Sequence, residues 1–387
     1  MYNLETIIEE NIANAISDLA NEYRAKGKPK VAKRLYLKVL KLREGLSTIN
    51  QQYHQPYIAE TLNSLAIVSK EENRYDLAIE YYLSAIFMVE ELFKMDSAQR
   101  YLDMLIHSYT DMAHIYRRDF KYEKAEFFYN KALTLYQDLS SEEFEKRQIQ
   151  RLNIYQHLSV ICNDQNKFKE TEEAYLGALT LYKLLVNEES NEYRDDLAIL
   201  LFNLSTLYFK NKQQNRAKQI YLWTLEILLS LAQKDSKRYR ETLASTLHNL
   251  AKIYTAQLEY ANALSAYRES LKYYIILAEE NPSKYSPYVA IIFKDLASFY
   301  RKQKKSDLAQ YFHLKAVECY SELAHYNESA YSLKLVSTII DGVCYYKQHS
   351  ISLYEAELIL NNYHDDSHGL KLLEKIHALR EEKNYVC

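Results

Sequence analysis

The segment 364–368, His-Asp-Asp-Ser-His, is the densest group of side chains able to bind a metal in this 387-residue chain. Two histidines four residues apart, as His364 and His368 are, lie on one face of a helix and suit a metal. The two aspartates and the following glycine instead favour a turn into the last helix, with Asp366 or Ser367 as its N-cap. We therefore expect neither a metal nor a cofactor.

Motifs for other chemistry do not occur. The chain has no glycine-rich phosphate loop, no nucleophile elbow and no HExxH sequence. Its four cysteines, Cys162, Cys319, Cys344 and Cys387, are scattered singly, so the spacing predicts no disulfide framework and favours a reducing, cytoplasmic location. Cys162 and Cys344 stand where small apolar packing residues are expected. These observations predict a protein that is not an enzyme.

A polar residue recurs inside an otherwise apolar pattern, once every 46 or 47 residues. Two interpretations stay open. The side chains are either solvated or tie neighbouring helices together, or they form a ladder that hydrogen-bonds the backbone of an extended ligand, for which asparagine is suited because it both donates and accepts. The eight positions are Asp18, Ser64, Asp111, His157, Asn203, Asn249, Asp295 and Asp341.

The residue after each of these polar positions defines a repeat. A small side chain follows it in nearly every copy, and a fixed period of this length is the signature of a solenoid, in which each unit packs only on its neighbours. The chain has only 5 glycines and 4 prolines, which is typical of a helical protein. The anchors are Leu19, Leu65, Met112, Leu158, Leu204, Leu250, Leu296 and Gly342.

The copy around Leu250 predicts two helices per repeat. Apolar residues at helical spacing favour a first helix from Tyr239 and a second from Tyr260, with a turn at Leu258 and Glu259. The second helix is expected to stop before Pro282. Ser286 is a candidate N-cap of the next first helix, with Pro287 at its first position. Thirteen residues after each anchor a small residue recurs, and seventeen after it a ring, Tyr in six of seven copies.

This order of Leu-small, Tyr, Ala, aromatic and Ala resembles the tetratricopeptide repeat (TPR) over about residues 4–362. The family period is about 34 residues, and the longer period here is similar to the repeats of kinesin light chains and of bacterial TPR proteins. The resemblance implies an all-α, right-handed superhelical solenoid of about eight repeats in 1–362. Residues 363–387 are expected to form a capping helix and tail, with Leu370, Leu373, Ile376 and Leu379 turned inward.

The resemblance also implies that the first helices line a concave groove that binds a peptide or a partner protein. Mapping the groove positions onto this sequence gives candidate partner-binding residues. A basic cluster between Lys252 and Lys302 suits an acidic segment. The matched Lys and Asn residues of the chaperone-binding clamp are not found, which disfavours that role. The candidates are His107, Asp111, His114, Arg117, Asn153, His157, Asn203, Lys210, His248, Asn249, Lys252, Lys294, Asp295 and Arg301.

The charge of the chain bears on its partners. The formal net charge is −3, with 49 basic and 52 acidic residues well mixed, so no basic stripe for nucleic acid and no polybasic segment for a membrane is present. The sequence contains no run of about 18 apolar residues, so we expect no membrane span. Two functions remain: an interaction scaffold or adaptor, or a regulatory sensor that controls a separate effector, such as a protease or a signalling ATPase, in trans. A homodimer formed through the convex surfaces stays open.

Overall fold

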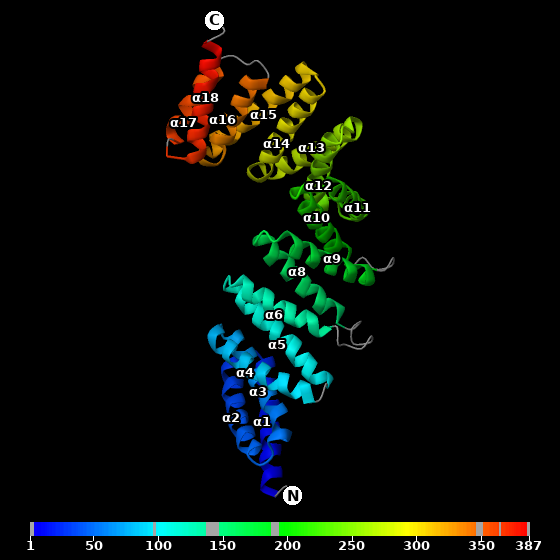
Figure 1. Cartoon of the computed structure of the whole chain (residues 1–387), viewed down its shortest axis with the longest axis vertical. Helices are drawn as coiled ribbons and strands as arrows, with labels where there is room; N and C mark the ends of the chain where they lie inside the picture. The colour runs from blue at the N-terminus through cyan, green and yellow to red at the C-terminus, as the bar shows by residue number, and fades with distance from the viewer. Residues whose placement is uncertain are drawn as a thin grey trace. The chain divides into compact units, whose positions relative to one another are not determined.

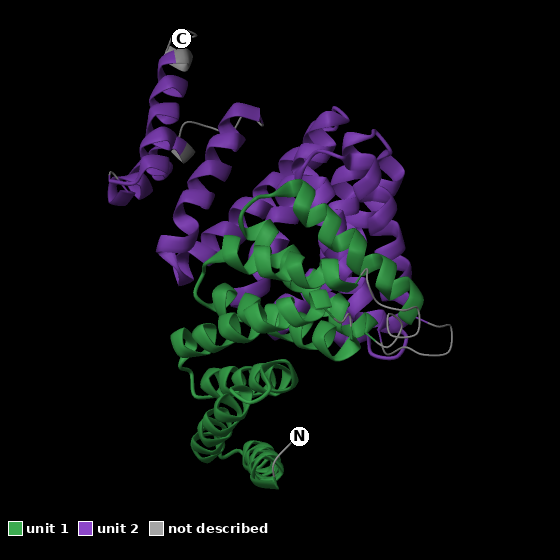
Figure 2. Ribbon diagram, turned by 60° about the horizontal axis from the view of Figure 1, so that its bottom comes forward, with its two compact units in different colours: residues 1–185 green, residues 186–387 purple. Residues whose placement is uncertain are grey.

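A computed structural model describes residues 4–95, 98–136, 147–186, 193–345, 351–363 and 365–384. Over these residues it contains 17 α-helices and no strand, so the predicted all-α class is confirmed (Figure 1). The helices fall into two compact units, residues 1–185 and 186–387 (Figure 2). Each unit is described by itself below.

Unit 1 (residues 1–185) is a series of helices in which each packs on the next. Two helices joined by a tight turn make one repeat, as the pattern predicted. The helices are α1 (Leu4–Ala25), α2 (Pro29–Ser47), α3 (Gln51–Glu71), α4 (Tyr75–Met95), α5 (Gln99–Arg118), α6 (Tyr122–Leu135), α8 (Gln148–Asp164) and α9 (Phe168–Leu185).

Unit 2 (residues 186–387) continues the pattern and ends in shorter helices. Its last described α-helix packs on the two α-helices before it. The helices are α10 (Arg194–Lys210), α11 (Gln214–Ala232), α12 (Ser236–Ala256), α13 (Tyr260–Glu280), α14 (Pro282–Lys302), α15 (Ser306–Tyr326), α16 (Glu328–Tyr345), α17 (Ile351–Leu360), the 3₁₀ turn η2 (Asn361–Tyr363) and α18 (Ser367–Asn384).

The turn inside each repeat has one conformation throughout. The residue eight positions after the anchor has a positive φ, between 55° and 68°, in seven repeats. A left-handed residue just after a helix lets the next amides bond the last free carbonyls of that helix. The Glu259 amide, for example, bonds the Tyr254 carbonyl at 2.9 Å. The seven residues are Gly27, Asn73, Phe120, Asn166, Lys212, Leu258 and Lys304.

The ring seventeen residues after the anchor is buried in every repeat where it was predicted, from Tyr36 to His313. It packs beside alanine and other small residues, which let the two helices approach each other closely. The anchors from Leu65 to Leu296 are also buried, whereas Leu19 is 42% exposed.

Two local predictions about helix starts need correction. We expected Ser286 to cap the helix that begins at Pro287, but α14 begins five residues earlier, at Pro282, and Pro287 lies inside it. Asn281 takes the capping role, because its side chain accepts a hydrogen bond from the Lys284 amide at 3.2 Å. Asparagine as N-cap followed by proline at the first position is a strong start signal, and it outweighs the later Ser-Pro pair.

The C-terminal turn has the predicted capping geometry. Asp366 accepts hydrogen bonds from the amides of His368 and Gly369, at 2.8 and 2.9 Å, and so caps α18. A side chain at Gly369 would meet the Tyr363 carbonyl at 2.6 Å, which explains the glycine. His364 lies outside the described residues. Ile376 is buried and Leu373 and Leu379 are partly buried, as expected, but Leu370 is exposed and Leu372 is buried in its place.

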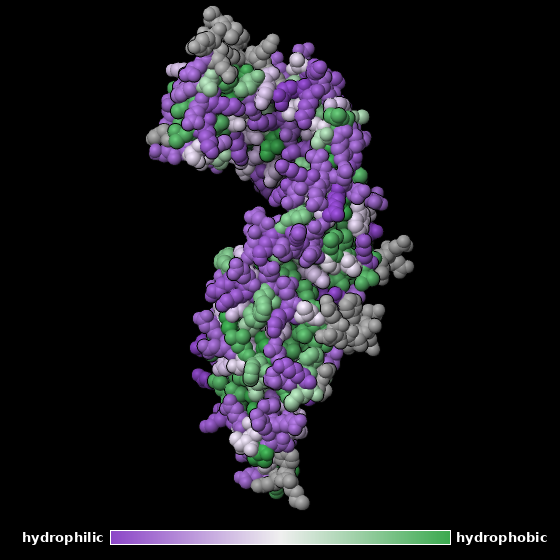
Figure 3. Space-filling model, viewed as in Figure 1, coloured by the Kyte–Doolittle hydropathy of each residue, from purple (hydrophilic) through white to green (hydrophobic). Residues whose placement is uncertain are grey.

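The surface of unit 1 carries both apolar and hydrophilic residues. Figure 3 shows apolar residues at the surface of unit 1 around α5 and α6, between hydrophilic ones. Phe87 and Phe127 are among the exposed large side chains of this unit. Of the helices described, none combines the length and the apolar character that a bilayer crossing requires.

Candidate functional site

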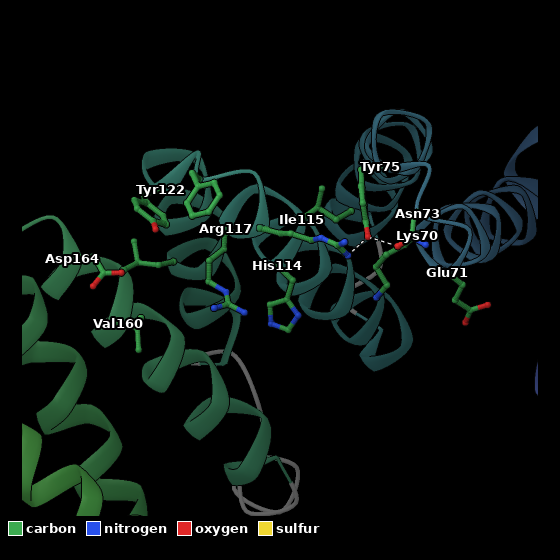
Figure 4. A pocket seen from close by; sticks show the side chains of 13 residues that line it. Lys70, Glu71, Asn73, Tyr75, His114, Ile115, Arg117, Tyr122, Val160 and Asp164 are labelled. Carbon is green, nitrogen blue, oxygen red and sulfur yellow. Dashed lines mark hydrogen bonds between the residues drawn. The ribbon is translucent and has the colours of Figure 1, made fainter. Parts of the chain in front are cut away.

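A pocket of about 710 Å³ lies among the helices of unit 1 (Figure 4). Three successive first helices, α3, α5 and α8, provide most of its wall, and the turns that follow them close one end. A volume of this size is within the range of about 300–1,000 Å³ of ligand sites. The lining residues are Lys70, Glu71, Asn73, Tyr75, His114, Ile115, Arg117, Arg118, Phe120, Tyr122, Val160, Ile161 and Asp164.

The repeat explains why these side chains meet. Positions two, five and six after the anchor lie on one face of a helix. The same turn of three stacked helices therefore faces the same space. Figure 4 shows Lys70, His114 and Arg117 pointing to the same side. His114 and Arg117 were predicted from the sequence, whereas Lys70 and Asp164 were missed, although the same offsets applied to the neighbouring repeats identify both.

The basic side chains that line the pocket differ in the partners that they have within the protein. The Lys70 ammonium lies 2.7 Å from an Asp111 carboxylate oxygen. The Arg118 guanidinium donates to the Tyr75 hydroxyl, which donates to Asn73 at 2.6 Å. By contrast, Arg117 forms no ion pair with a carboxylate among the described residues, although its Nε is buried. Arg117 is therefore the cation with most capacity left for a ligand.

Two histidines pack against each other beside this cation. The rings of His114 and His157 lie 4.8 Å apart, edge to face, and His157 stacks on Tyr129 at 5.7 Å. Burial, followed by the charges of Lys70 and Arg117, lowers the pKa of His114, although Asp111 opposes this. Burial, then His114 and Arg117, lowers the pKa of His157 to about 4. Both rings are accordingly neutral at pH 7.

The polar residue before the anchor contacts the neighbouring repeat at several positions. In unit 1, Asp111 accepts a hydrogen bond from the hydroxyl of Tyr82 at 2.5 Å and pairs with Lys70. In unit 2, Asn249 donates to the Tyr221 hydroxyl at 2.8 Å. Tyr82 and Tyr221 are rings from the preceding repeat, so these polar side chains hold successive helix pairs together.

The basic candidates of unit 2 are mostly paired in the same way. Asp295 binds the His248 Nε2 at 2.7 Å and lies 3.9 Å from the Lys252 ammonium. Lys294 lies 2.8 Å from an oxygen of Asp341. Two cations of the basic cluster predicted for an acidic segment, Lys252 and Lys294, thus lie beside carboxylates of the same unit.

The remaining candidates lie outside such pairs. Asn153, Asn203 and Lys210 are exposed, and His107 is exposed with its Nδ1 2.8 Å from the Asp103 carbonyl. The Arg301 guanidinium lies 3.9 Å from the centre of the Tyr345 ring, a cation–π contact. Over the described part of the chain, no three His, Cys, Asp or Glu residues gather as metal ligands would.

Comparisons with known proteins agree with this architecture. Family models described as tetratricopeptide repeat match residues 106–139 and residues 243–282. The first match contains α6 and part of α5, and the second contains α13 and part of α12. No curated protein matches the chain.

The solved structures that match the chain are distant from it in sequence. The apo form of RapI is 12% identical, with 97% of this chain and 99% of that chain covered and a TM-score of 0.49. BtubC (BKLC) from P. vanneervenii is 22% identical over 64% of this chain and 92% of that chain, with a TM-score of 0.39. YrrB, a TPR protein with an unusual peptide-binding site, is 15% identical over 62% and 97%, with a TM-score of 0.38. These two matches identify tetratricopeptide repeats within the chain, and the helix pairs follow the same arrangement.

Proposed function

We propose that this protein is a non-catalytic interaction scaffold that binds a peptide or a segment of a partner protein along the first helices of its repeats. The observation that carries the proposal is the 710 Å³ pocket, where equivalent positions of α3, α5 and α8 converge. Repetition gives an extended ligand the same type of contact from each successive helix.

The chemistry of the pocket favours a ligand that offers an acceptor group. The guanidinium of Arg117 forms no ion pair with a carboxylate among the described residues, and Arg118 and Lys70 line the same pocket. The apolar side chains of Ile115 and Val160 add contact area. A backbone carbonyl or a carboxylate of the ligand is the natural partner of Arg117.

The experiment is affinity purification from the native source, with the wild type and two charge-reversal variants as bait. Arg117→Glu is expected to lose the principal partner. Arg34→Glu makes the same change at an exposed position of α2 and is expected to retain it. Circular dichroism checks that both variants fold. Equal recovery of every partner by the two variants would remove the pocket from the proposal.

A further inference from the structure

Unit 2 encloses a second pocket, of about 860 Å³, between the ends of α13 and α15 and the first turns of α14 and α16. The buried side chains of Val289 and Leu323 lie at its floor. At its rim, Ile275 and Tyr326 are 41% and 87% exposed. Large exposed apolar side chains around a concave surface are typical of a protein-binding site.

Comparison with the preceding repeat shows why this space is open. Asp235, Asn281 and Asn327 cap the first helices of three successive repeats, α12, α14 and α16, at intervals of 46 residues. These caps fix which residues correspond between the repeats. Cys319 corresponds to Tyr273, whose ring packs against an apolar cluster formed by α10, α11 and α12. A thiol in place of a phenol ring leaves a hollow at this position.

The mouth of the pocket is open for a related reason. In the preceding repeat the guanidinium of Arg240 lies 3.0 Å from the Glu280 carboxylate and bridges the two sides. The corresponding residues here are Ser286 and Tyr326, which form no such ion pair. Three differences from the preceding repeat thus favour an open space at this joint.

The rim carries negative charge. Glu279 and Glu322 are the only charged side chains among the described residues that line the pocket, and both are exposed. The preceding repeat has Gln233 and Ile276 at these positions. Of the two joints, only this one therefore carries carboxylates there. Among the described residues neither carboxylate forms an ion pair, and the nearby Lys315 is paired with Glu318 at 2.6 Å.

We propose that this pocket is a second docking site, distinct from the one in unit 1, for a partner segment that carries a large apolar side chain beside lysine or arginine. The apolar side chain fills the space that Tyr273 fills one repeat earlier, and burial of Ile275 and Tyr326 provides most of the affinity. The basic neighbours complement Glu279 and Glu322 and select the partner by charge.

A random twelve-residue peptide library displayed on phage tests this proposal. The bait is the full chain, in the presence of excess soluble Cys319→Tyr variant, which removes peptides that bind elsewhere. Enriched peptides are expected to combine aliphatic or aromatic residues with lysine or arginine. No enrichment over the competitor, or enrichment of acidic or purely polar peptides, would overturn the proposal.

A binding measurement on one enriched peptide then locates the site. Fluorescence anisotropy is expected to show at least a tenfold weaker affinity for Cys319→Tyr and for Ser286→Arg, the residues of the preceding repeat. Cys319→Ala keeps the hollow open and is expected to bind as the wild type does. Tyrosine fits the corresponding position 273, and a thermal melt checks that each variant folds. Unchanged binding to both filled variants would refute the assignment.

Discussion

At the scale of single residues, the neutral ring of His157 makes unit 1 sensitive to acid. Its folded pKa is about 4, below the value of about 6.5 in an unfolded chain. The unfolded state therefore binds the proton more readily, so this contribution to stability is complete above about pH 6.5 and is lost as the pH falls toward 4. The groups that face the ring, His114, Arg117 and Tyr129, offer no carboxylate to offset the new charge.

We expect acidification from pH 7 to 4.5 to reduce the free energy of unfolding by about 1–2 kcal/mol through this ring, after allowance for solvent screening. Denaturant titrations over that pH range measure the effect. His157→Asn replaces the ring with the residue found at the equivalent positions 203 and 249. Its stability should depend less on pH, and an identical profile for wild type and variant would contradict the explanation.

Asp295 tests whether the polar residue before the anchor stabilises the fold. Asp295→Ala removes the acceptor of His248 and the neighbour of Lys252, and should destabilise the protein by about 1–2 kcal/mol. Asn203→Ala changes the same repeat position where the side chain is exposed, so its effect should stay within about 0.5 kcal/mol. Thermal unfolding compares the two, and equal melting temperatures would show that the contacts of Asp295 add nothing.

At the scale of elements, the turn after α12 places a leucine in a left-handed backbone conformation. Leu258 has φ of 63° and is 66% exposed, so its side chain contributes little packing to offset a left-handed backbone. Leu258→Gly should therefore stabilise the protein by up to about 1 kcal/mol. Leu308→Gly, at an exposed position inside α15, should cost about 1 kcal/mol in a chemical denaturation series. A loss of stability for both variants would mean that Leu258 packs against the fold after all.

Helices and turns were predictable because their causes recur at each repeat. Leu258 stands eight residues after its anchor in a pattern that seven copies share, and the spacing alone located the turn. The start of α14 was misplaced because Asn281-Pro282 and Ser286-Pro287 are both capping signals, and only the length of α13 decides between them. Of the residues that line the pocket around Arg117, the groove positions derived from the sequence include His114 and Arg117 but not Lys70 and Asp164. The hollow at Cys319 depends on what a ring fills one repeat earlier, which a motif search does not reveal.

At the scale of the whole molecule, α18 covers apolar side chains of the helices before it in unit 2. Ile376 of α18 is fully buried, and α18 packs against α16 and α17. Ile376→Ala should cost about 2–4 kcal/mol, whereas Lys375→Ala, at the adjacent exposed position, should be nearly neutral. Thermal melts and light scattering make the comparison. Wild-type stability in Ile376→Ala would show that α18 is dispensable.

The response of the molecule to a ligand separates the two functions that the sequence left open. The His248–Asp295 hydrogen bond and the Lys294–Asp341 ion pair join successive helix pairs, and each contact would have to break for neighbouring repeats to rotate. A ligand shifts such an equilibrium only by its difference in affinity for the two states. We therefore expect the radius of gyration from small-angle X-ray scattering to stay unchanged when the partner segment binds. A reproducible contraction or expansion would instead favour a regulatory sensor that acts on an effector in trans.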